Sequence, residues 1–315
     1  MTFALALHIA LAGMMLGLAA WTIAARETFA AVVGFVVYGL FLALVWVRLD
    51  AVDVALAEAA IGGGLNGLLL LGAAARLRAT ETPADAERPR AGLRLLAALL
   101  SATVAAALAA AVLQLPEPAP TLAPEAAANA AATGLANPVT NVLMGFRAMD
   151  TMLEKVVLLL AVVGVWSLAP DHFWGGRPGA RHEADPQGTL AFLARVLTPF
   201  GIVVGIYLAW TGASHPGGAF QGATILAAMW LLIMMAGLAD APPTNARRLR
   251  LMLIAGPGVF LLVGLGGLAF GEAFLAYPAA YAKPLILAIE AAMVLTVAIT
   301  LGLLVAGPPE RGAAP

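Results

Sequence analysis

Seven charged side chains lie in or beside long apolar runs: Asp53, Glu58, Arg147, Asp150, Glu154, Lys155 and Glu290. A charged group at the centre of a bilayer costs roughly 2.5–3.5 kcal/mol on insertion scales, so such groups usually face protein or water. Carboxylates held in a low-dielectric environment can exchange protons near neutral pH. These residue types could serve proton relay or cation binding, or they could form structural pairs between helices, and we expect no catalytic residues.

The composition excludes most other classes of protein. Hydrophobic residues make up 62% of the 315 residues, and only 11% are charged, whereas soluble domains usually carry about 25% charged residues. The chain has no cysteine, a net charge of -1 and four histidines without metal-ligand spacing. We therefore expect no disulfide, no metal site, no cofactor and no nucleic-acid partner. An integral membrane protein remains.

Nine segments are apolar and long enough to act as membrane spans. A helix needs about 20 mostly apolar residues to cross a bilayer, and the runs lack the alternation that is typical of transmembrane β-strands. We predict an all-α, polytopic membrane helix bundle with about nine transmembrane helices: Phe3–Ala25, Thr28–Val47, Val52–Ala75, Leu95–Leu115, Met149–Ala169, Leu190–Thr211, Ala219–Leu238, Leu251–Gly271 and Leu285–Ala306.

The distribution of basic residues predicts the orientation of these spans. Lys and Arg concentrate in cytoplasmic loops. In a nine-helix arrangement one side holds twelve of them and the other holds four, leaving out Arg195 inside its helix. The N-terminus is therefore expected outside and the C-terminus in the cytoplasm, with the chain in the inner (cytoplasmic) membrane. Two polar stretches, 76–90 and 170–187, are expected to be cytoplasmic linkers.

The third predicted span carries two carboxylates and a glycine run. Asp53 and Glu58 lie about 140° apart around a helix, so they cannot form a carboxylate pair on one face. A solvated helix start is the simplest interpretation of Asp53, whereas Glu58 could have a structural partner or a role in ion movement. Gly62, Gly63 and Gly64 predict close helix packing, or else a π-bulge that can change conformation.

A charged turn precedes the fifth span. Arg147, Asp150 and Glu154 share a helix face, which is ordinary on a solvated surface helix. The apolar run that follows Lys155 has only 14 residues, or about 21 Å of helix. Part of this turn is therefore expected within the membrane or in a vestibule that a partner covers. Glu290 has no Lys or Arg near it in sequence, and its structural and functional interpretations both stay open.

A tight turn with the sequence GASHPGGAFQG, residues 212–222, separates two clean helices. A compact outer loop explains the proline and the glycines. The aromatic residue and the glutamine at the start of the next helix suggest docking against another chain. The predicted docking residues are His215, Pro216, Gly217, Gly218, Phe220 and Gln221.

The segment around this turn resembles the MrpB (or MnhB) component of the Mrp (multiple resistance and pH) multisubunit Na+/H+ antiporters. That family carries a Pro-Phe pair in the incoming helix and a Ser-Pro-Gly-Gly-Gly-Phe-Gln-Gly-Gly signature. His215, Ala219 and Ala223 depart from the signature, and the matching residues are Pro199, Phe200, Pro216, Gly217, Gly218, Phe220, Gln221 and Gly222.

Two earlier segments resemble other parts of the same group, which is related to complex I. Leu49–Ala73 is similar to the C-terminal end of MrpA and to the MbhD component of membrane-bound hydrogenases. Asn137–Leu168 is similar to the adjoining E-type domain (MbhE). The resemblances imply five parts: an N-terminal helix at 1–28, an MbhD-like region at 29–78, an MbhE-like region at 92–169, a cytoplasmic linker at 170–188 and an MrpB-like domain at 189–307.

The resemblance implies a membrane component of a multisubunit Na+/proton-translocating complex, which contributes ion relay and docking between subunits. Glu58, Asp150, Glu154 and Glu290 would be relay sites, together with Asp53, Arg147 and Lys155, and the glycine run would allow helix rearrangement. Implied partners are large MrpA- or MrpD-type antiporter subunits, a small K-like MrpC-type subunit, lipid, Na+ and H+. Three alternatives stay open: the same module in a membrane-bound hydrogenase-like or other redox- or carbon-linked complex, a purely structural scaffold, and an independent transporter.

Overall fold

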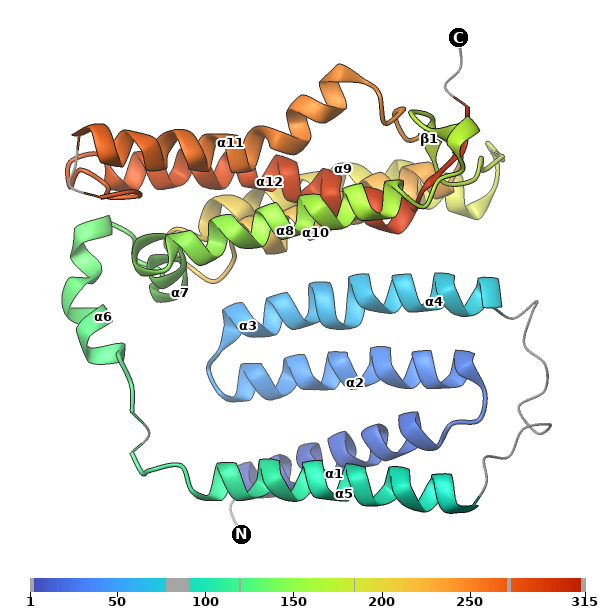
Figure 1. Cartoon of the computed structure of the whole chain (residues 1–315), viewed down its shortest axis with the longest axis vertical. Helices are drawn as coiled ribbons and strands as arrows, with labels where there is room; N and C mark the ends of the chain where they lie inside the picture. The colour runs from blue at the N-terminus through green and yellow to red at the C-terminus, as the bar shows by residue number, and fades with distance from the viewer. Residues whose placement is uncertain (1–2, 78–90, 119, 184, 271–272, 313–315) are drawn as a thin grey trace.

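The computed structural model describes residues 3–77, 91–118, 120–183, 185–270 and 273–312. Most of the predicted basic linker at 76–90 lies outside these residues. The described chain is almost entirely helical (Figure 1), with these elements in order: α1 (Phe3–Ala24), α2 (Thr28–Arg48), α3 (Val52–Ala57), the π-helix η1 (Glu58–Leu65), α4 (Asn66–Leu77), α5 (Ala91–Leu113), α6 (Ala123–Asn129), the 3₁₀ helix η3 (Ala130–Thr133), α7 (Pro138–Asn141), the π-helix η4 (Val142–Phe146), α8 (Ala148–Trp166), the 3₁₀ helix η5 (Asp171–Phe173), β1 (Arg177–Pro178), α9 (Thr189–Thr211), α10 (Ala219–Met235), α11 (Arg247–Phe270), α12 (Ala282–Ala306) and β2 (Pro309–Arg311).

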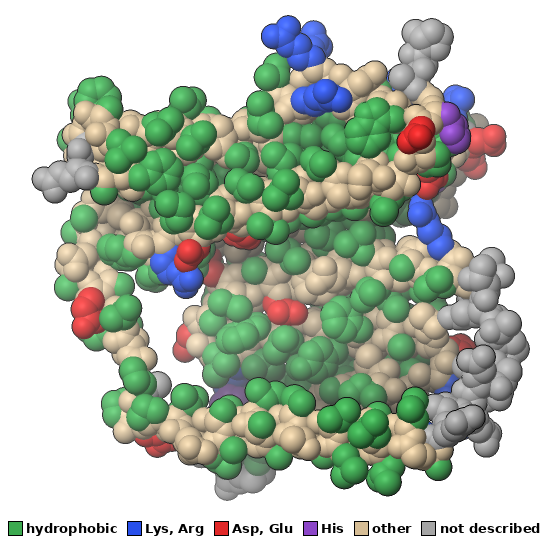
Figure 2. All heavy atoms as spheres, in the orientation of Figure 1, with side chains coloured by type: hydrophobic (Ala, Val, Ile, Leu, Met, Phe, Trp, Pro, Cys, Tyr) green, Lys and Arg blue, Asp and Glu red, His purple; other side chains and the backbone are tan. Residues whose placement is uncertain are grey.

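The prediction of an all-α, polytopic membrane protein is confirmed. Within the described residues, seven helical runs are long and apolar enough to cross a membrane. Two further predicted spans also form helices but fall short of that measure. One is α10, with 17 residues, and the other is α8, whose first turns carry charged residues. In Figure 2, hydrophobic side chains cover much of the visible face of both the N-terminal and the C-terminal helices, as expected of helices that face lipid.

The C-terminal helices form a bundle around α12. Half of the most apolar stretch of α12 is buried, a larger share than in any other candidate span of the described chain. It packs against α8, α10 and α11. Ile286, Ile289 and Val297 of α12 and Phe260 of α11 are inaccessible to solvent. This bundle supplies the rigid frame on which the ionisable residues of α8 and α12 are held.

The N-terminal helices pack through glycines. The run from α3 through η1 to α4 lies against α2, and its middle is π-helical from Glu58 to Leu65. The glycine run was predicted to allow close packing or else to form a π-bulge, and the structure shows both. A role of the run in rearrangement stays a prediction. A Cβ atom on Gly39 of α2 would lie 3.0 Å from the backbone nitrogen of Gly63, so the two backbones are in direct contact.

Replacing Gly39 with leucine is therefore expected to destabilise the N-terminal helices by about 1–3 kcal/mol, the usual cost of overpacking a close contact. The thermal unfolding temperature of the detergent-solubilised chain measures this loss. Gly17→Leu in α1 is the matched control, because a Cβ at Gly17 meets no atom within 4 Å in the described structure. Equal unfolding temperatures for the two variants would contradict the close packing.

The helices α5 and α6 lie outside the N-terminal helices and the C-terminal bundle. The helix α5 buries none of its described side chains, and α6 connects it toward the C-terminal bundle along one edge of the molecule (Figure 1). A helix that is apolar on every side needs lipid or another protein around it. The fold therefore leaves the whole surface of α5 available to its surroundings.

The two short strands tie the C-terminal segment to the linker after α8. β1 and β2 pair antiparallel, with Arg177 opposite Arg311. Arg311 donates from Nη1 to Oδ1 of Asp240 at 2.9 Å and from Nε to the carbonyl oxygen of Gly179 at 3.1 Å. We call this pair of strands the C-terminal clip, and it closes the end of the molecule where α10 and α12 finish.

The clip should depend on pH only in the acid range. The hydrogen bond from Arg311 holds the pKa of Asp240 below its usual value. A lowered pKa in the folded state contributes stability above the unfolded pKa of about 3.9, and that stability is lost as the pH falls through the lower folded value. Amide exchange at Arg311, corrected for intrinsic rates, is therefore expected to stay constant from neutral pH to about 5 and to accelerate below about 4. Asp240→Asn should abolish this step, and an unchanged step would contradict the role of Asp240.

Candidate functional site

One cavity gathers four of the seven charged residues that the sequence singles out. Its volume is about 360 Å³, and its walls come from α3, α8, α12, the segment 139–144 and the turn at 217–221. Its ionisable lining residues are Asp53, Glu154, Lys155 and Glu290. We call it the relay cavity. It joins the N-terminal helices to the C-terminal bundle, so segments far apart in sequence build it together.

Asp53 closes one end of the relay cavity by holding the turn. Its Oδ1 accepts the backbone N–H of Gly217 at 2.9 Å. Its backbone carbonyl accepts from Nε2 of Gln221 at 3.3 Å. Asp53 is therefore more than a solvated helix start. Three members of the predicted docking set lie at this junction, since His215 also contributes its carbonyl oxygen there. The contacts described for this turn lie within the chain, and its docking to another subunit stays a prediction.

Asn137 is a site residue that the sequence prediction did not select. Its Nδ2 donates to the carbonyl of His215 at 2.9 Å and, more weakly, to the Asp53 carboxylate at 3.4 and 3.5 Å. Its Oδ1 caps the start of α7 by accepting from Val139 and Thr140. The sequence signal for this role is Asn followed by Pro, which is typical of a helix N-terminus. The buried side-chain amide of Asn137 thus connects α3, the start of α7 and the turn that contains His215.

Lys155 is almost completely enclosed, with 1% of its surface exposed. Its Nζ lies 3.1 Å from Oε2 of Glu154 and 3.5 Å from the ring centroid of Phe220. The direction of the Glu154 oxygen does not satisfy a hydrogen bond, so within the described residues the ammonium is held by charge and by the aromatic face. Its N–H groups can donate hydrogen bonds to water or to another acceptor inside the cavity.

Glu290 contributes the other enclosed charge. Its side chain is 6% exposed, and Oε2 has no hydrogen-bond partner in the described part of the chain. A carboxyl oxygen in this position costs free energy unless a proton, a cation or water satisfies it. Since Glu290 and Lys155 line the same cavity, a water molecule between them would satisfy both groups, whereas a proton or a cation would satisfy the carboxyl oxygen alone. This arrangement can bind and release a proton or a small cation.

The structure places three predicted relay residues elsewhere. Glu58 does not line the relay cavity, and its carboxylate instead occupies the space that a side chain on Gly62 would need. Arg147 and Asp150 form an ion pair at 2.6 Å with both side chains more than half exposed. Their relay roles remain predictions, and the solvated interpretation fits the Arg147–Asp150 pair. Among the described residues, no group of three or more His, Asp or Glu could hold a metal ion.

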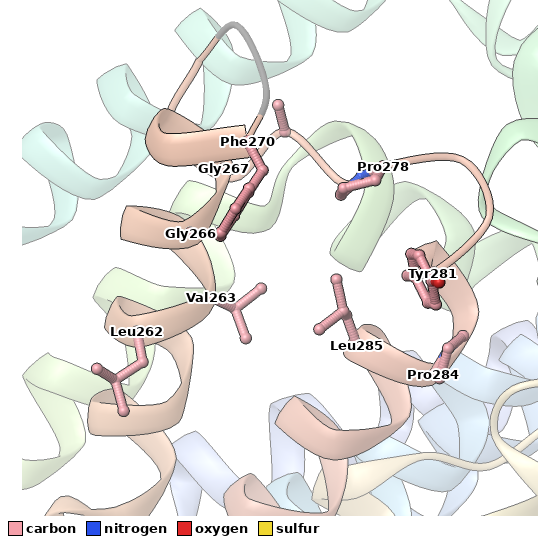
Figure 3. Close-up of a pocket in the computed structure, with 10 residues that line it drawn as sticks. Leu262, Val263, Gly266, Gly267, Phe270, Pro278, Tyr281, Pro284 and Leu285 are labelled. Carbon is pink, nitrogen blue, oxygen red and sulfur yellow. The ribbon is translucent and has the colours of Figure 1, made fainter.

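A second cavity, of about 730 Å³, lies between the ends of α11 and α12 and the loop that joins them. Figure 3 shows Phe270, Val263, Leu285 and Tyr281 around its open space. Its lining is apolar apart from the tyrosine hydroxyl and contains no carboxylate, ammonium or guanidinium group. It therefore lacks the ionisable groups that line the relay cavity.

Two family models match two of the regions that build the relay cavity. The MbhD model, which describes the D component of MBH, matches residues 13–79. The model described as "Domain related to MnhB subunit of Na+/H+ antiporter" matches residues 189–308. This chain is a fusion of an MbhD-type region with an MnhB-related domain. The MbhD-type region supplies Asp53, and the MnhB-related domain supplies Phe220 and Glu290. The predicted E-type region at 92–169, which supplies Lys155, stays a prediction.

Two solved structures share the fold of this fusion. A chain of the Mrp complex from Dietzia sp. DQ12-45-1b matches with 24% identity and a TM-score of 0.76, over 97% of this chain and 35% of that one. A chain of the membrane-bound sulfane sulfur reductase, an archaeal respiratory membrane complex, matches with 24% identity and a TM-score of 0.57, over 67% of this chain and 96% of that one. The MbhD–MnhB fusion thus spans about a third of the Mrp chain that it matches. No curated protein matches the sequence.

Proposed function

We propose that the chain is a membrane subunit of a multisubunit, Mrp- or complex I-like ion-translocating complex, and that the relay cavity is part of its ion path. The observation that carries the proposal is the convergence of Asp53, Glu154, Lys155 and Glu290 on one cavity between the MbhD-type region and the MnhB-related domain. Such groups in a membrane-embedded interior mark ion and proton pathways.

The cavity supports exchange of a proton or a cation, not a covalent step. Glu290 offers an oxygen with no partner in the described residues, which a proton or Na+ would satisfy. Lys155 sets the local charge, because its ammonium is fixed beside Glu154 and over Phe220. A charge that arrives at Glu290 changes the electrostatic balance at Lys155, and this coupling would pass along the cavity toward Asp53. The chain contributes relay and docking, and the proposal assigns it no enzymatic activity of its own.

The proposal includes a nine-span topology in the inner membrane. The seven apolar runs together with α8 and α10 make nine helical spans, and the distribution of Lys and Arg supports an outer N-terminus and a cytoplasmic C-terminus. Other Mrp-type membrane subunits are the proposed partners: MrpA- and MrpD-type antiporter subunits and a small K-like MrpC-type subunit. The fully exposed surface of α5 supports such neighbours.

Deleting the coding sequence from its host is the test of this function. Cation-dependent proton movement in everted membrane vesicles is expected to disappear and to return when the chain is supplied from a plasmid. The remaining subunits are quantified in the same membranes, so that loss of transport can be compared with loss of assembly. Unchanged proton movement in the deletion strain would contradict the proposal.

A redox-linked host complex is a second candidate. The MbhD match and the shared fold with a chain of the sulfane sulfur reductase favour it. Purification of the complex from native membranes separates the two hosts. Iron–sulfur or nickel subunits that copurify with the chain would favour the redox-linked host, whereas antiporter-type subunits alone would favour the Mrp type.

A further inference from the structure

A third cavity, separate from the relay cavity, lies where α4, α10 and α12 end beside the C-terminal clip. Its volume is about 690 Å³. Leucines and methionines of these helices form the inner wall, among them Leu68, Met234 and Leu304, while Arg76, Asp240 and Arg311 lie at the rim. We call it the rim cleft. It separates α4 of the MbhD-type region from the MnhB-related domain.

The rim cleft is apolar along the helices and charged at one end, which suits an amphiphilic ligand. Its walls are mostly apolar on the side of the helices, and its charges are confined to the end where the helices finish. Figure 2 shows acidic, basic and histidine side chains gathered at the molecular edge near β1 and the C-terminal strand. Clefts with basic residues at the boundary of transmembrane helices bind lipid headgroups. An inorganic ion would leave the apolar wall uncovered.

The charges of the rim alternate in sign. Nη2 of Arg76 lies 3.3 Å from Oε1 of Glu310, and Nη1 of Arg311 lies 2.9 Å from Oδ1 of Asp240. Arg76 keeps 69% of its side chain exposed, and Glu310 and Asp240 keep 36% and 42%. Arg311 is 22% exposed and also donates to Gly179. A pair as exposed as Arg76–Glu310 contributes about 0–1 kcal/mol, so a ligand that carries both charges can replace it readily.

We propose that the rim cleft binds a phospholipid with a phosphoethanolamine headgroup. The phosphate would accept hydrogen bonds from Arg76 and Arg311, and the primary ammonium would donate to Asp240 and Glu310. A glycerol headgroup offers no cation to replace the arginines at the two carboxylates once the arginines turn to the phosphate. A choline headgroup carries a charge but no N–H, so it forgoes the charge-assisted hydrogen bonds. The acyl chain would fill the space between α4 and α10. The proposal rests on the membrane location of the chain and is independent of the ion path.

Native mass spectrometry of the full chain, released from detergent with added lipid, tests the proposal. Phosphatidylethanolamine, phosphatidylcholine and phosphatidylglycerol with identical acyl chains are titrated separately. Phosphatidylethanolamine is expected to bind at a single site about tenfold more tightly than the other two, the ratio that the loss of one charge-assisted hydrogen bond produces.

Two variants place the lipid in the rim cleft. Gly72→Leu is expected to lower the affinity by about tenfold, because Gly72 lines the cleft and a Cβ there meets nothing within 4 Å, so the leucine fills the acyl space without a clash. Gly164→Leu in α8 is its control, since its Cβ is equally unobstructed but does not line the cleft. Arg76→Gln should weaken binding of all three lipids, whereas Arg248→Gln, at an exposed position of α11 outside the cleft, should not. Equal affinities for the three lipids, or equal binding by the two glycine variants, would overturn the proposal.

Discussion

Lys155→Gln is expected to lower the cation-dependent proton flux of the assembled complex by at least about tenfold, the effect of about 1.4 kcal/mol on a rate-limiting barrier. Lys155 is 1% exposed, and its ammonium lies between Glu154 and the ring of Phe220. Glutamine keeps much of the side-chain volume but removes the charge. The relay cavity then loses the cation that balances its carboxylates. Proton flux in everted vesicles, driven by added Na+, measures the loss.

The control for this variant is Lys283→Gln. Lys283 is the other lysine of the chain, and it is exposed at the start of α12. Both variants are compared at equal amounts of assembled complex, which native gels of the same membranes report. Full flux in Lys155→Gln with normal assembly would show that the enclosed ammonium is outside the ion path.

Glu290→Gln is the second large effect that we expect. Glutamine is nearly isosteric with glutamic acid, and Oε2 of Glu290 makes no hydrogen bond within the described residues, so the helix bundle should persist. The amide cannot take up or release a proton. Flux should therefore fall by at least about tenfold at every pH tested, instead of shifting along the pH axis. The pH profile of Na+-driven proton flux is the measurement.

Glu125→Gln serves as the control for Glu290→Gln. Glu125 lies on the exposed surface of α6, where loss of one charge should leave the flux unchanged. If Glu290→Gln retained the full flux of this control across the pH range, Glu290 would be structural only, and the scaffold interpretation would be favoured.

The helices and the π-helical defect follow from the sequence because their causes are local. Hydropathy over some 20 residues predicts each span. Three successive glycines weaken the α-helix locally, and the π-helix that begins at Glu58 contains them. These features need no knowledge of what packs against them. The short apolar run after Lys155 predicts that part of the charged turn lies within the membrane or in a vestibule, but it does not predict that Lys155 is buried inside the chain.

The partners of Asp53 could not be predicted in the same way. Its carboxylate accepts the N–H of Gly217, which is 164 residues away in sequence, and helical periodicity says nothing about such contacts. The turn was predicted to dock against another chain because its residues are more specific than a plain loop needs. The structure shows that much of this specificity is used within the chain, at Asp53 and Asn137. The sequence gives no reason to prefer Glu154 over Glu58 as a relay residue, although only Glu154 lines the relay cavity.

The relay cavity as one functional unit is tested most directly by the double variant Lys155→Gln/Glu290→Gln. Groups that act as a unit have strongly non-additive effects. At equal amounts of assembled complex, we expect Na+-driven proton flux in the double variant to equal that of the single variant with the lower flux. Losses that multiply would show two independent roles. Recovery of flux in the double variant would show that the two residues merely neutralise each other, and either result would contradict a shared ion path.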